Sequence, residues 1–273
     1  MTSLSSILVS FFLLSLSLSI CRGAVLVLGA TGRTGSLLYR ELKDRGIDNV
    51  RGLVRNTTKA REVLHCTSCN QDEGIYLGDI TNGTSLGSAF RGVHTVAIAT
   101  GVSGRGQESW DQIKAIEFVG VQNAVRALVQ DANRERFGGI HNLRVVLCSS
   151  QGTTEAFNDT FGTILHYKLN AEAFLGSVGI PTSVVKPCGL VDAAGRNSTL
   201  LALHDDARTP TGSRVIPRAD VARVMAELVI RQPTENLRFD LCSIEGPATT
   251  DLGELIDSAK WSWQQGDDMA LDK

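Results

Sequence analysis

The 273 residues are 42% hydrophobic and 21% charged, a composition typical of a folded globular protein and unlike that of a disordered or fibrous chain. A chain of this length predicts one large α/β domain with at most a modest appended lobe. The formal net charge of -2, without a block of like charges, gives no electrostatic reason to expect nucleic acid or an anionic membrane surface as a partner. A small molecule is therefore the expected ligand.

The first 21 residues carry no charged side chain, and the stretch from Ile7 to Ile20 is apolar except for interspersed serines. Signal-peptide cores have this length and texture, whereas a membrane span needs roughly 20 apolar residues. We expect residues 1–23 to be a signal peptide or hydrophobic leader, cleaved before Ala24, that takes the chain into the secretory pathway: the endoplasmic reticulum, secretion, or an organelle reached through it. No stable membrane span is expected after its removal. The alternatives are an uncleaved anchor and a mistaken start codon, and in the second case the protein is cytoplasmic.

Beyond the leader, short apolar runs alternate with longer amphipathic ones, which is the pattern of parallel strands joined by helices. The predicted strands are Ala24–Leu28, Val50–Val54, Ile75–Leu77, Val93–Ala99, Arg144–Cys148 and Thr182–Val185, and the predicted helices are Gly35–Arg45, Leu86–Phe90, Trp110–Ala132 and about Tyr167–Leu175. Shorter signals follow: an apolar run Leu200–Leu203, a helix Asp220–Arg231, a strand Leu237–Leu241 and a helix Asp251–Ala259.

This order predicts an α/β fold with a doubly wound parallel sheet of the Rossmann type. We expect one NAD(P)-binding domain over residues 24–273, in which about 189–273 form a small C-terminal substrate lobe over the carboxyl edge of the sheet. Ligands of doubly wound sheets bind at that edge.

A glycine-rich segment, Gly29-Ala-Thr-Gly32-Arg-Thr-Gly35, directly follows the first predicted strand and opens the first predicted helix. Glycines there allow a tight turn, close approach of the backbone to a pyrophosphate, and close packing of the helix on the strand. The helix N-terminus adds free N–H groups and a positive dipole. We predict that this segment binds the pyrophosphate of a nicotinamide dinucleotide through Gly29, Thr31, Gly32, Arg33, Thr34 and Gly35.

The end of the second strand distinguishes the two nicotinamide dinucleotides. A carboxylate there would bind the adenosine ribose hydroxyls of NAD(H), whereas a basic group would meet the 2′-phosphate of NADP(H). Arg55 follows this strand, and Arg33 in the glycine segment can reach the same phosphate with a second guanidinium. We therefore predict NADP(H) as cofactor, with NAD(H) less favoured; the alternative for both arginines is that they are merely solvated.

Seven motifs carry a family resemblance: GATGRTG at 29–35, LVRN at 53–56, GDIT at 78–81, AIATG at 97–101, SSQG at 149–152, VVKPCGL at 184–190 and IPRADVA at 216–222. Through them the sequence resembles the atypical short-chain dehydrogenase/reductases, specifically their NmrA-like NAD(P)-binding group, over nearly all of 24–231. The resemblance implies that Asp79 and Ile80 lie by the adenine ring, that Ala99, Thr100 and Gly101 flank the ribose and pyrophosphate, and that Pro187 borders the nicotinamide.

Catalytic members of this superfamily carry a tyrosine and, four residues later, a lysine that lowers the tyrosine pKa so that it can exchange a proton with the substrate. The Lys-x-x-x-Glu spacing puts the lysine at Lys168 and the tyrosine position at Ile164, which cannot transfer a proton. Tyr167, one helical turn from Ile164, is a candidate substitute. Lys168 is expected to hold the nicotinamide ribose, and Ser149 or Ser150 to line the same cavity; the alternatives are a solvated lysine and two strand-end caps.

Six cysteines stand at positions 21, 66, 69, 148, 188 and 242, and cleavage before Ala24 would leave five, an odd number that makes a poor disulfide framework. Cys66 and Cys69 form the one notable pair. No second CxxC motif or histidine pair at metal spacing accompanies them, so we expect a local disulfide or two free thiols and no metal site.

Two functions remain open at this stage. The complete cofactor half and Lys168 favour an NADP(H)-dependent oxidoreductase that acts on a small carbonyl or a related compound. Ile164 favours a non-catalytic NADP(H)-binding redox sensor or assembly protein, which would have a protein partner.

Overall fold

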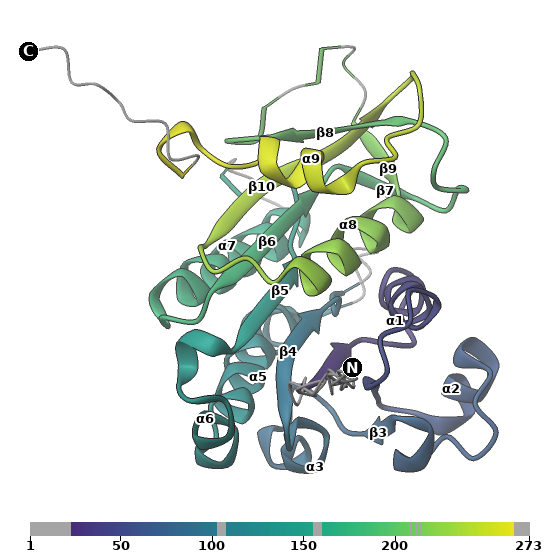
Figure 1. The fold of residues 1–273 in the computed structure, drawn as a ribbon, viewed down its shortest axis with the longest axis vertical. Helices are drawn as coiled ribbons and strands as arrows, with labels where there is room; N and C mark the ends of the chain where they lie inside the picture. The colour runs from purple at the N-terminus through teal and green to yellow at the C-terminus, as the bar shows by residue number, and fades with distance from the viewer. Residues whose placement is uncertain are drawn as a thin grey trace, which may run out of the picture.

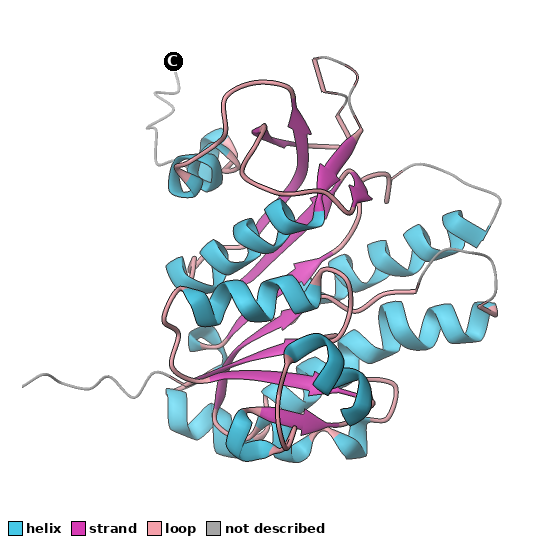
Figure 2. Ribbon diagram, turned by 90° about the vertical axis from the view of Figure 1, so that its right-hand side faces the viewer, coloured by secondary structure: helices cyan, strands magenta, loops and turns pink. Residues whose placement is uncertain are grey.

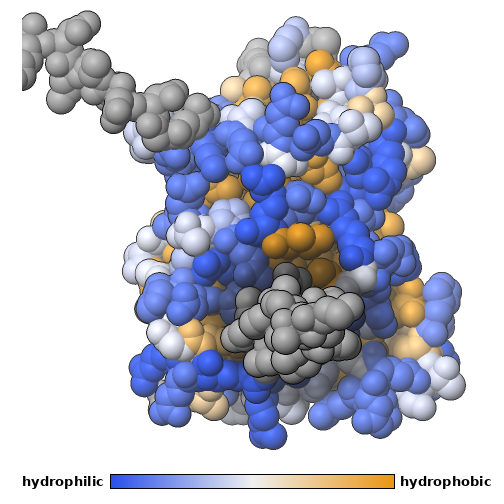
Figure 3. Space-filling model, in the orientation of Figure 1, coloured by the Kyte–Doolittle hydropathy of each residue, from blue (hydrophilic) through white to orange (hydrophobic). Residues whose placement is uncertain are grey.

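The computed structural model describes residues 23–102, 108–154, 160–207, 209, 210, 212 and 214–264. The predicted leader lies outside the described residues, apart from Gly23. Within those ranges, every helix is too short or too polar to cross a lipid bilayer. On the face drawn in Figure 3, hydrophilic side chains surround scattered hydrophobic patches.

Eight strands form the central sheet, in the order β3-β2-β1-β4-β5-β6-β10-β8 (Figures 1 and 2). Their bounds are β1 Ala24–Leu28, β2 Val50–Val54, β3 Ile75–Leu77, β4 Val93–Ile98, β5 Arg144–Cys148, β6 Thr182–Pro187, β8 Thr199–Leu203 and β10 Leu237–Ile244. All neighbours pair in parallel except β8, which is antiparallel to β10. The strand order reverses between β1 and β4, so the carboxyl ends of these two strands flank the topological switch point.

Helices cover both faces of this sheet (Figure 1). On one face lie α1 Gly35–Asp44, α2 Thr57–Leu64, α8 Arg218–Arg231 and α9 Leu252–Ser258; on the other lie α3 Gly87–Phe90, α4 Trp110–Lys114, α5 Gly120–Leu128, α6 Asp131–Phe137 and α7 Thr160–Ser177. A π-helical turn, Ala115–Val119, joins α4 to α5, and 3-10 turns occur at Gln71–Glu73, Gly83–Ser85, Ile140–Asn142 and Ser262–Gln264. The predicted doubly wound α/β fold is confirmed.

Successive residues of β1 contribute to two separate hydrophobic cores. Val25 and Val27 pack under α1 and α8, while Leu26 and Leu28 pack under the helices of the opposite face, and all four are at most 6% exposed. Alternation of side chains across a strand explains this division. Burial on both faces explains why the strand reads as one continuous apolar run.

The predicted helix over Trp110–Ala132 is wrong as a single element. The π turn interrupts it, α5 ends at Leu128, and a separate helix begins at Asp131. A π turn carries more residues than an α-helical turn and shifts the faces of the helix. Because apolar residues cover a broad face of this stretch, the sequence pattern does not reveal the shift.

One further helix boundary differs from the prediction, and one helix was not predicted. Helix α7 begins at Thr160, seven residues before the predicted start at Tyr167. Helix α2 was not predicted, because it buries only Ala60 and therefore has almost no apolar periodicity; the Asn56 side chain caps it by accepting from the Lys59 N–H.

The segment predicted as a C-terminal lobe divides between two structures. Strands β10 and β8 extend the main sheet, whereas β7 Gly189–Val191 and β9 Val215–Pro217 form a separate parallel pair. Helix α8 packs on α1. The segment is thus joined to the Rossmann sheet by backbone hydrogen bonds.

Two disulfides link cysteines in the described chain, Cys66 to Cys69 and Cys188 to Cys242, and Cys148 is a buried free thiol. The first is one of the two states expected for that pair. The second was not predicted, because Cys188 and Cys242 meet only through the parallel pairing of β6 with β10. With Glu73, Cys66 and Cys69 form a cluster of potential metal ligands, but both sulfurs are held in the disulfide.

The glycine segment makes a close contact between β1 and α1. Gly29 has φ +79°, and its carbonyl oxygen accepts from the Gly32 N–H at 2.8 Å. A Cβ at Gly35 would lie 2.1 Å from that same oxygen. Only glycine at the first helical position lets the helix start this close to the strand.

Gly35→Ala is therefore expected to lower the free energy of unfolding by about 1–3 kcal/mol, because the methyl group pushes the helix away from a backbone oxygen. Gly176→Ala in α7 is the matched control: no heavy atom lies within 4 Å of its added Cβ, and alanine favours a helix. Urea denaturation of both variants measures the effect. Equal stability of the two variants would contradict the packing account.

Candidate functional site

Two cavities meet along the carboxyl edge of the sheet. The smaller, of about 220 Å³, lies at the ends of β2 and β3, and the larger, of about 500 Å³, lies between the ends of β4, β5 and β6 and helix α7. Residues that line both are Gly32, Ala99, Thr100 and Gly101. The two cavities therefore form one cleft that passes over the glycine segment.

Most residues singled out from the sequence line this cleft. In the smaller cavity are Gly29, Thr31, Arg55, Asp79 and Ile80; in the larger are Arg33, Thr34, Ser149, Ser150, Ile164, Lys168 and Pro187. Gly35 lies behind the loop at the start of α1, where it makes the close contact described above. Tyr167 lines neither cavity, and its ring makes an edge-to-face contact with His166.

The cationic groups at the smaller cavity differ from those expected. Arg55 lies there, with its guanidinium 3.9 Å from the Asp79 carboxylate, and Lys59 of α2 lines the same cavity. Arg33 instead lines the larger cavity, 3.7 Å from Asp192. The structure thus brings Lys59, and not Arg33, to the cavity with Arg55. Sequence reasoning missed Lys59 because it missed α2.

A buried ion pair lies beneath the larger cavity. The Lys168 ammonium is 2.8 Å from Glu117 Oε2, and Glu117 Oε1 accepts from the Val102 N–H at 2.8 Å. Glu117, only 4% exposed, is on the π turn, which aims it at α7. Burial, the largest single influence, would lower the pKa of Lys168, but the Glu117 carboxylate, together with Cys148 and Glu172, outweighs it, so the pKa lies above the ordinary 10.5. Lys168 is therefore a fixed cation at neutral pH.

A second carboxylate lies behind Ser149, at the end of β5. The Ser149 hydroxyl donates a hydrogen bond to Glu172 Oε1, and Glu172 Oε2 accepts from Arg238 Nε at 2.8 Å. Ser149 and Glu172 are both nearly buried, whereas the Arg238 side chain is about one-third exposed. The neighbouring Cys148 thiol has its pKa raised to about 11 by burial.

Ile164 presents a hydrocarbon to the larger cavity at the position expected for the tyrosine. It is 4% exposed and lies one helical turn before Lys168 on α7. Leu165 and Leu190 extend the apolar wall. This wall can exclude water from a ligand but cannot exchange a proton with it.

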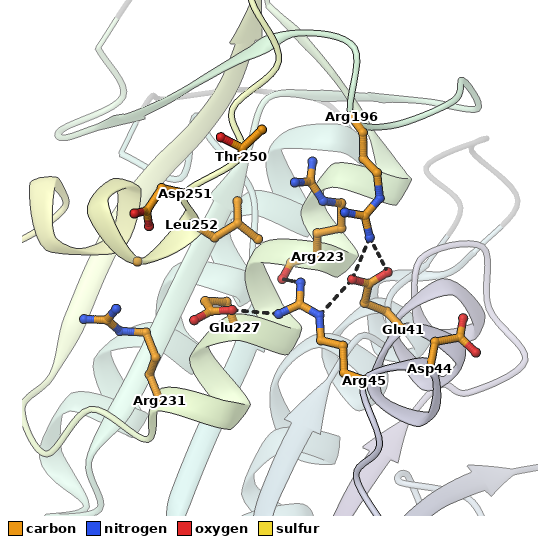
Figure 4. A pocket seen from close by; sticks show the side chains of 11 residues that line it. Glu41, Asp44, Arg45, Arg196, Arg223, Glu227, Arg231, Thr250, Asp251 and Leu252 are labelled. Atoms are coloured by element: carbon orange, nitrogen blue, oxygen red, sulfur yellow. Dashed lines mark hydrogen bonds and ion pairs between the residues drawn. The ribbon is translucent and has the colours of Figure 1, made fainter.

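Another cavity, of about 750 Å³, lies away from this cleft, between α1, α8 and the start of α9 (Figure 4). Its charged side chains are largely occupied with each other: Arg45 pairs with Glu41 and Glu227 at 2.8 and 2.7 Å, and Arg196 pairs with Glu41 at 3.0 Å. No residue of the glycine segment lines it. We interpret it as an ion-paired groove that holds α1 against α8.

The difference in unfolding free energy between wild type and Glu117→Gln is expected to be about 3 kcal/mol at neutral pH, because the variant leaves Lys168 a buried cation without its partner. The pKa of Lys168 is raised by folding, so the pair stabilises the native state below the ordinary lysine pKa. That contribution is lost as the pH rises through the raised value. The difference should therefore shrink above about pH 10.5.

Urea denaturation at a series of pH values checks this expectation. Exposed Glu62→Gln on α2 serves as the control, for which no such pH-dependent difference is expected. A Glu117→Gln difference that stays constant from pH 7 to 11 would show that the carboxylate does not act through the charge of Lys168.

Known proteins resemble this chain in sequence. An uncharacterised chloroplastic protein of Arabidopsis thaliana is 30% identical over 239 residues, covering 80% of this chain and 69% of that protein. Sanguinarine reductase of Eschscholzia californica is 29% identical over 274 residues, covering 85% of this chain and 94% of that protein. The chloroplastic protein TIC 62 of Pisum sativum is 29% identical over 184 residues, covering 61% and 32% respectively.

Solved structures share the fold. A Bacillus halodurans protein described as an NAD-dependent epimerase/dehydratase superposes with a TM-score of 0.66 at 24% identity, covering 86% of this chain and 99% of its own. Triphenylmethane reductase of Citrobacter sp., in complex with NADP(H), gives a TM-score of 0.51 at 18% identity, covering 81% and 72%. The family described as NAD(P)H-binding matches residues 29–232, more than half of the chain. The chain therefore belongs to the NAD(P)H-binding family, with the fold of the atypical short-chain dehydrogenase/reductases.

Proposed function

We propose that the protein is an NADP(H)-dependent reductase whose cofactor lies across the two joined cavities. The observation that carries this proposal is the position of Gly32, Ala99, Thr100 and Gly101, which line both cavities beside the start of α1. The adenosine half would occupy the smaller cavity and the nicotinamide half the larger. The pyrophosphate would then meet the N-terminus of α1, where anions are favoured.

The loop fits a closely approaching pyrophosphate. A Cβ at Gly29 would lie 2.8 Å from the Ala99 carbonyl oxygen, and one at Gly32 would lie 3.0 Å from the Gly29 carbonyl oxygen. Thr34 precedes α1 without a side-chain cap, so its hydroxyl does not occupy the backbone N–H groups there. These features favour a ligand that takes its hydrogen bonds from the backbone.

NADP(H) is favoured over NAD(H) by the two cationic side chains at the smaller cavity. Arg55 and Lys59 belong to adjacent elements and can meet a 2′-phosphate together, and Asp79 already attracts Arg55 toward that cavity. The Citrobacter reductase that shares the fold was solved with NADP(H).

When bound, the nicotinamide supplies or accepts a hydride. Lys168, fixed by Glu117, can donate to the nicotinamide ribose hydroxyls, and Pro187 borders the same cavity. Ile164, Leu165 and Leu190 form an apolar wall that excludes water from the substrate. A small carbonyl or another electron-poor compound fits this arrangement, and two of the similar proteins are named as reductases.

Ile164 also supports a second function, a non-catalytic NADP(H)-binding sensor with a protein partner. In that case cofactor binding would change partner affinity without any consumption of NADPH. Partner affinity that is the same with and without NADPH would exclude the sensor. Steady consumption of NADPH with one member of a carbonyl panel would establish the reductase.

Two changes test the cofactor assignment. Arg55→Ala and Lys59→Ala are each expected to weaken NADPH binding by about tenfold while leaving NADH binding unchanged, because only NADPH carries the 2′-phosphate. Isothermal titration calorimetry with both cofactors measures the effect. Arg61→Ala, also an exposed cation on α2, is the matched control and should change neither affinity.

Arg33→Ala distinguishes the two cavities. Because Arg33 lines the larger cavity, its loss should affect NADPH and NADH equally. An NADPH-selective loss in Arg33→Ala, with none in Arg55→Ala and Lys59→Ala, would place the 2′-phosphate elsewhere.

We also propose that the protein works inside an organelle, because two of the similar proteins are named as chloroplastic. Entry through the secretory pathway stays a prediction from residues 1–23. A fluorescent protein fused to the C-terminus of the whole chain should label an organelle, and the same fusion without residues 1–23 should remain in the cytosol. Identical cytosolic labelling by both fusions would refute the leader.

A further inference from the structure

Reduction of a carbonyl requires a proton for the oxygen, and the tyrosine that usually supplies it is replaced by Ile164. Tyr167 lines neither cavity. A proton source other than this tyrosine is therefore needed, a need that rests on the proposed reductase function.

The Ser149–Glu172 contact has the geometry of a proton relay. Ser149 lines the larger cavity, and its hydroxyl donates to Glu172 Oε1. Arg238 Nε holds the other carboxylate oxygen at 2.8 Å, so Glu172 is fixed from both sides. Glu172 is 6% exposed, and its contact with Ser149 therefore links it to the cavity.

Three other groups in the described part of this cavity are less suited to pass on a proton. The pKa of Lys168 is raised by Glu117, so the ammonium holds its proton strongly. Burial raises the pKa of Cys148 to about 11, so this thiol is also a weak acid. The Ser150 hydroxyl donates to the Gln151 carbonyl oxygen, which does not titrate. Ser149 alone among these hydroxyl and thiol groups is seen bonded to a carboxylate.

We propose that Ser149 and Glu172 form a proton relay that takes the place of the missing tyrosine. In reduction, the carbonyl carbon accepts a hydride from the cofactor, and the electron pair of the C=O π bond moves to the oxygen. That oxygen takes the Ser149 proton, and Ser149 is reprotonated through Glu172, whose carboxylate relays a proton taken up from water. The products are the alcohol and the oxidised cofactor, and the Glu172 carboxylate is unchanged over the turnover.

The protonation state of Glu172 sets the direction in which Ser149 acts. With the carboxylate ionised, Ser149 donates to it and offers only lone pairs to the cavity, which suits removal of a proton from an alcohol. With Glu172 protonated, its O–H donates to Ser149, and the Ser149 hydrogen can turn toward a carbonyl oxygen. The contact in the structure is thus the one that takes up a proton from an alcohol, and reduction of a carbonyl is the reverse of that transfer.

Charged groups surround this carboxylate on each side described. Arg238 faces it from β10, and Lys168 interacts with it from one turn away on α7. Glu117 on the π turn acts on it through Lys168, and Cys148 on β5 is a neutral thiol. The carboxylates of Glu117 and Glu172 thus alternate with the cations of Lys168 and Arg238. Of the two carboxylates, Glu172 is the one that contacts the Ser149 hydroxyl.

Two kinds of hydride acceptor separate the relay from general damage to the site. A panel of aromatic and aliphatic aldehydes needs a proton at oxygen, whereas N-methylquinolinium becomes neutral when it takes a hydride and needs none. NADPH oxidation is measured with both, in wild type and in Glu172→Gln and Ser149→Ala. Both variants should slow aldehyde reduction by about 10²–10⁴-fold and should slow reduction of N-methylquinolinium far less.

Two additional readouts test for proton transfer itself. Ser149→Thr keeps the hydroxyl and should retain most of the aldehyde activity that Ser149→Ala loses. Aldehyde reduction by wild type should be slower in D₂O than in H₂O, and this solvent isotope effect should be absent for N-methylquinolinium.

The outcomes distinguish the relay from the function on which it rests. Equal loss with both acceptors, or no loss with either, overturns the relay and leaves the NADPH-dependent reductase standing. If the wild-type protein reduces only N-methylquinolinium, the relay is likewise overturned and the reductase function stands. If the wild-type protein oxidises NADPH with neither the aldehydes nor N-methylquinolinium, the proposed reductase function fails, and the relay fails with it.

Discussion

The close contact between Gly29 and Gly35 determines where everything else in the site lies. Because the Gly29 carbonyl oxygen faces the first turn of α1, that helix begins directly above the end of β1. Parallel pairing then brings the carboxyl ends of β2, β4, β5 and β6 to the same edge. The two cavities meet at the glycine segment for this reason. A side chain at Gly35 would separate the helix from the strand, and one at Gly29 would meet the Ala99 carbonyl oxygen, so either would disrupt this meeting point.

Helix α7 organises the other side of the cleft. Ile164, Lys168 and Glu172 follow one another at intervals of four residues and therefore share one face of the helix. Glu117 and Arg238 meet this face from the π turn and from β10. Buried charges are costly unless each has a partner of opposite sign. The alternation of two carboxylates with two cations allows charged groups to lie close to an apolar cavity wall.

Local sequence patterns were enough to predict the framework. The β1 strand, the glycine segment and the start of α1 follow each other without a gap, so the turn from strand to helix at Gly29 to Gly35 could be predicted from the sequence alone. Lys59 could not, because α2 buries only Ala60 and leaves no periodic signal. Glu117 counts as a solvated residue in any amphipathic pattern, and only the π turn and Lys168 explain its burial.

Contacts between segments that are far apart in the chain also could not be predicted from the sequence. Ser149 meets Glu172, and Cys188 meets Cys242, only after the sheet has assembled. Arg33 lies within the predicted pyrophosphate loop, yet its side chain lines the larger cavity, whereas Arg55 lines the smaller one. The chemistry of the cleft therefore depends on topology more than on any single motif.

The central claim is that one dinucleotide occupies both cavities, and a crystal structure of the complex with NADP⁺ tests it most directly. The account predicts the pyrophosphate over Gly29 to Gly35, the 2′-phosphate between Arg55 and Lys59, and the nicotinamide beside Lys168 and Ile164. NADP⁺ bound in the groove between α1 and α8, or with its nicotinamide outside the cavity lined by Ile164, would contradict it.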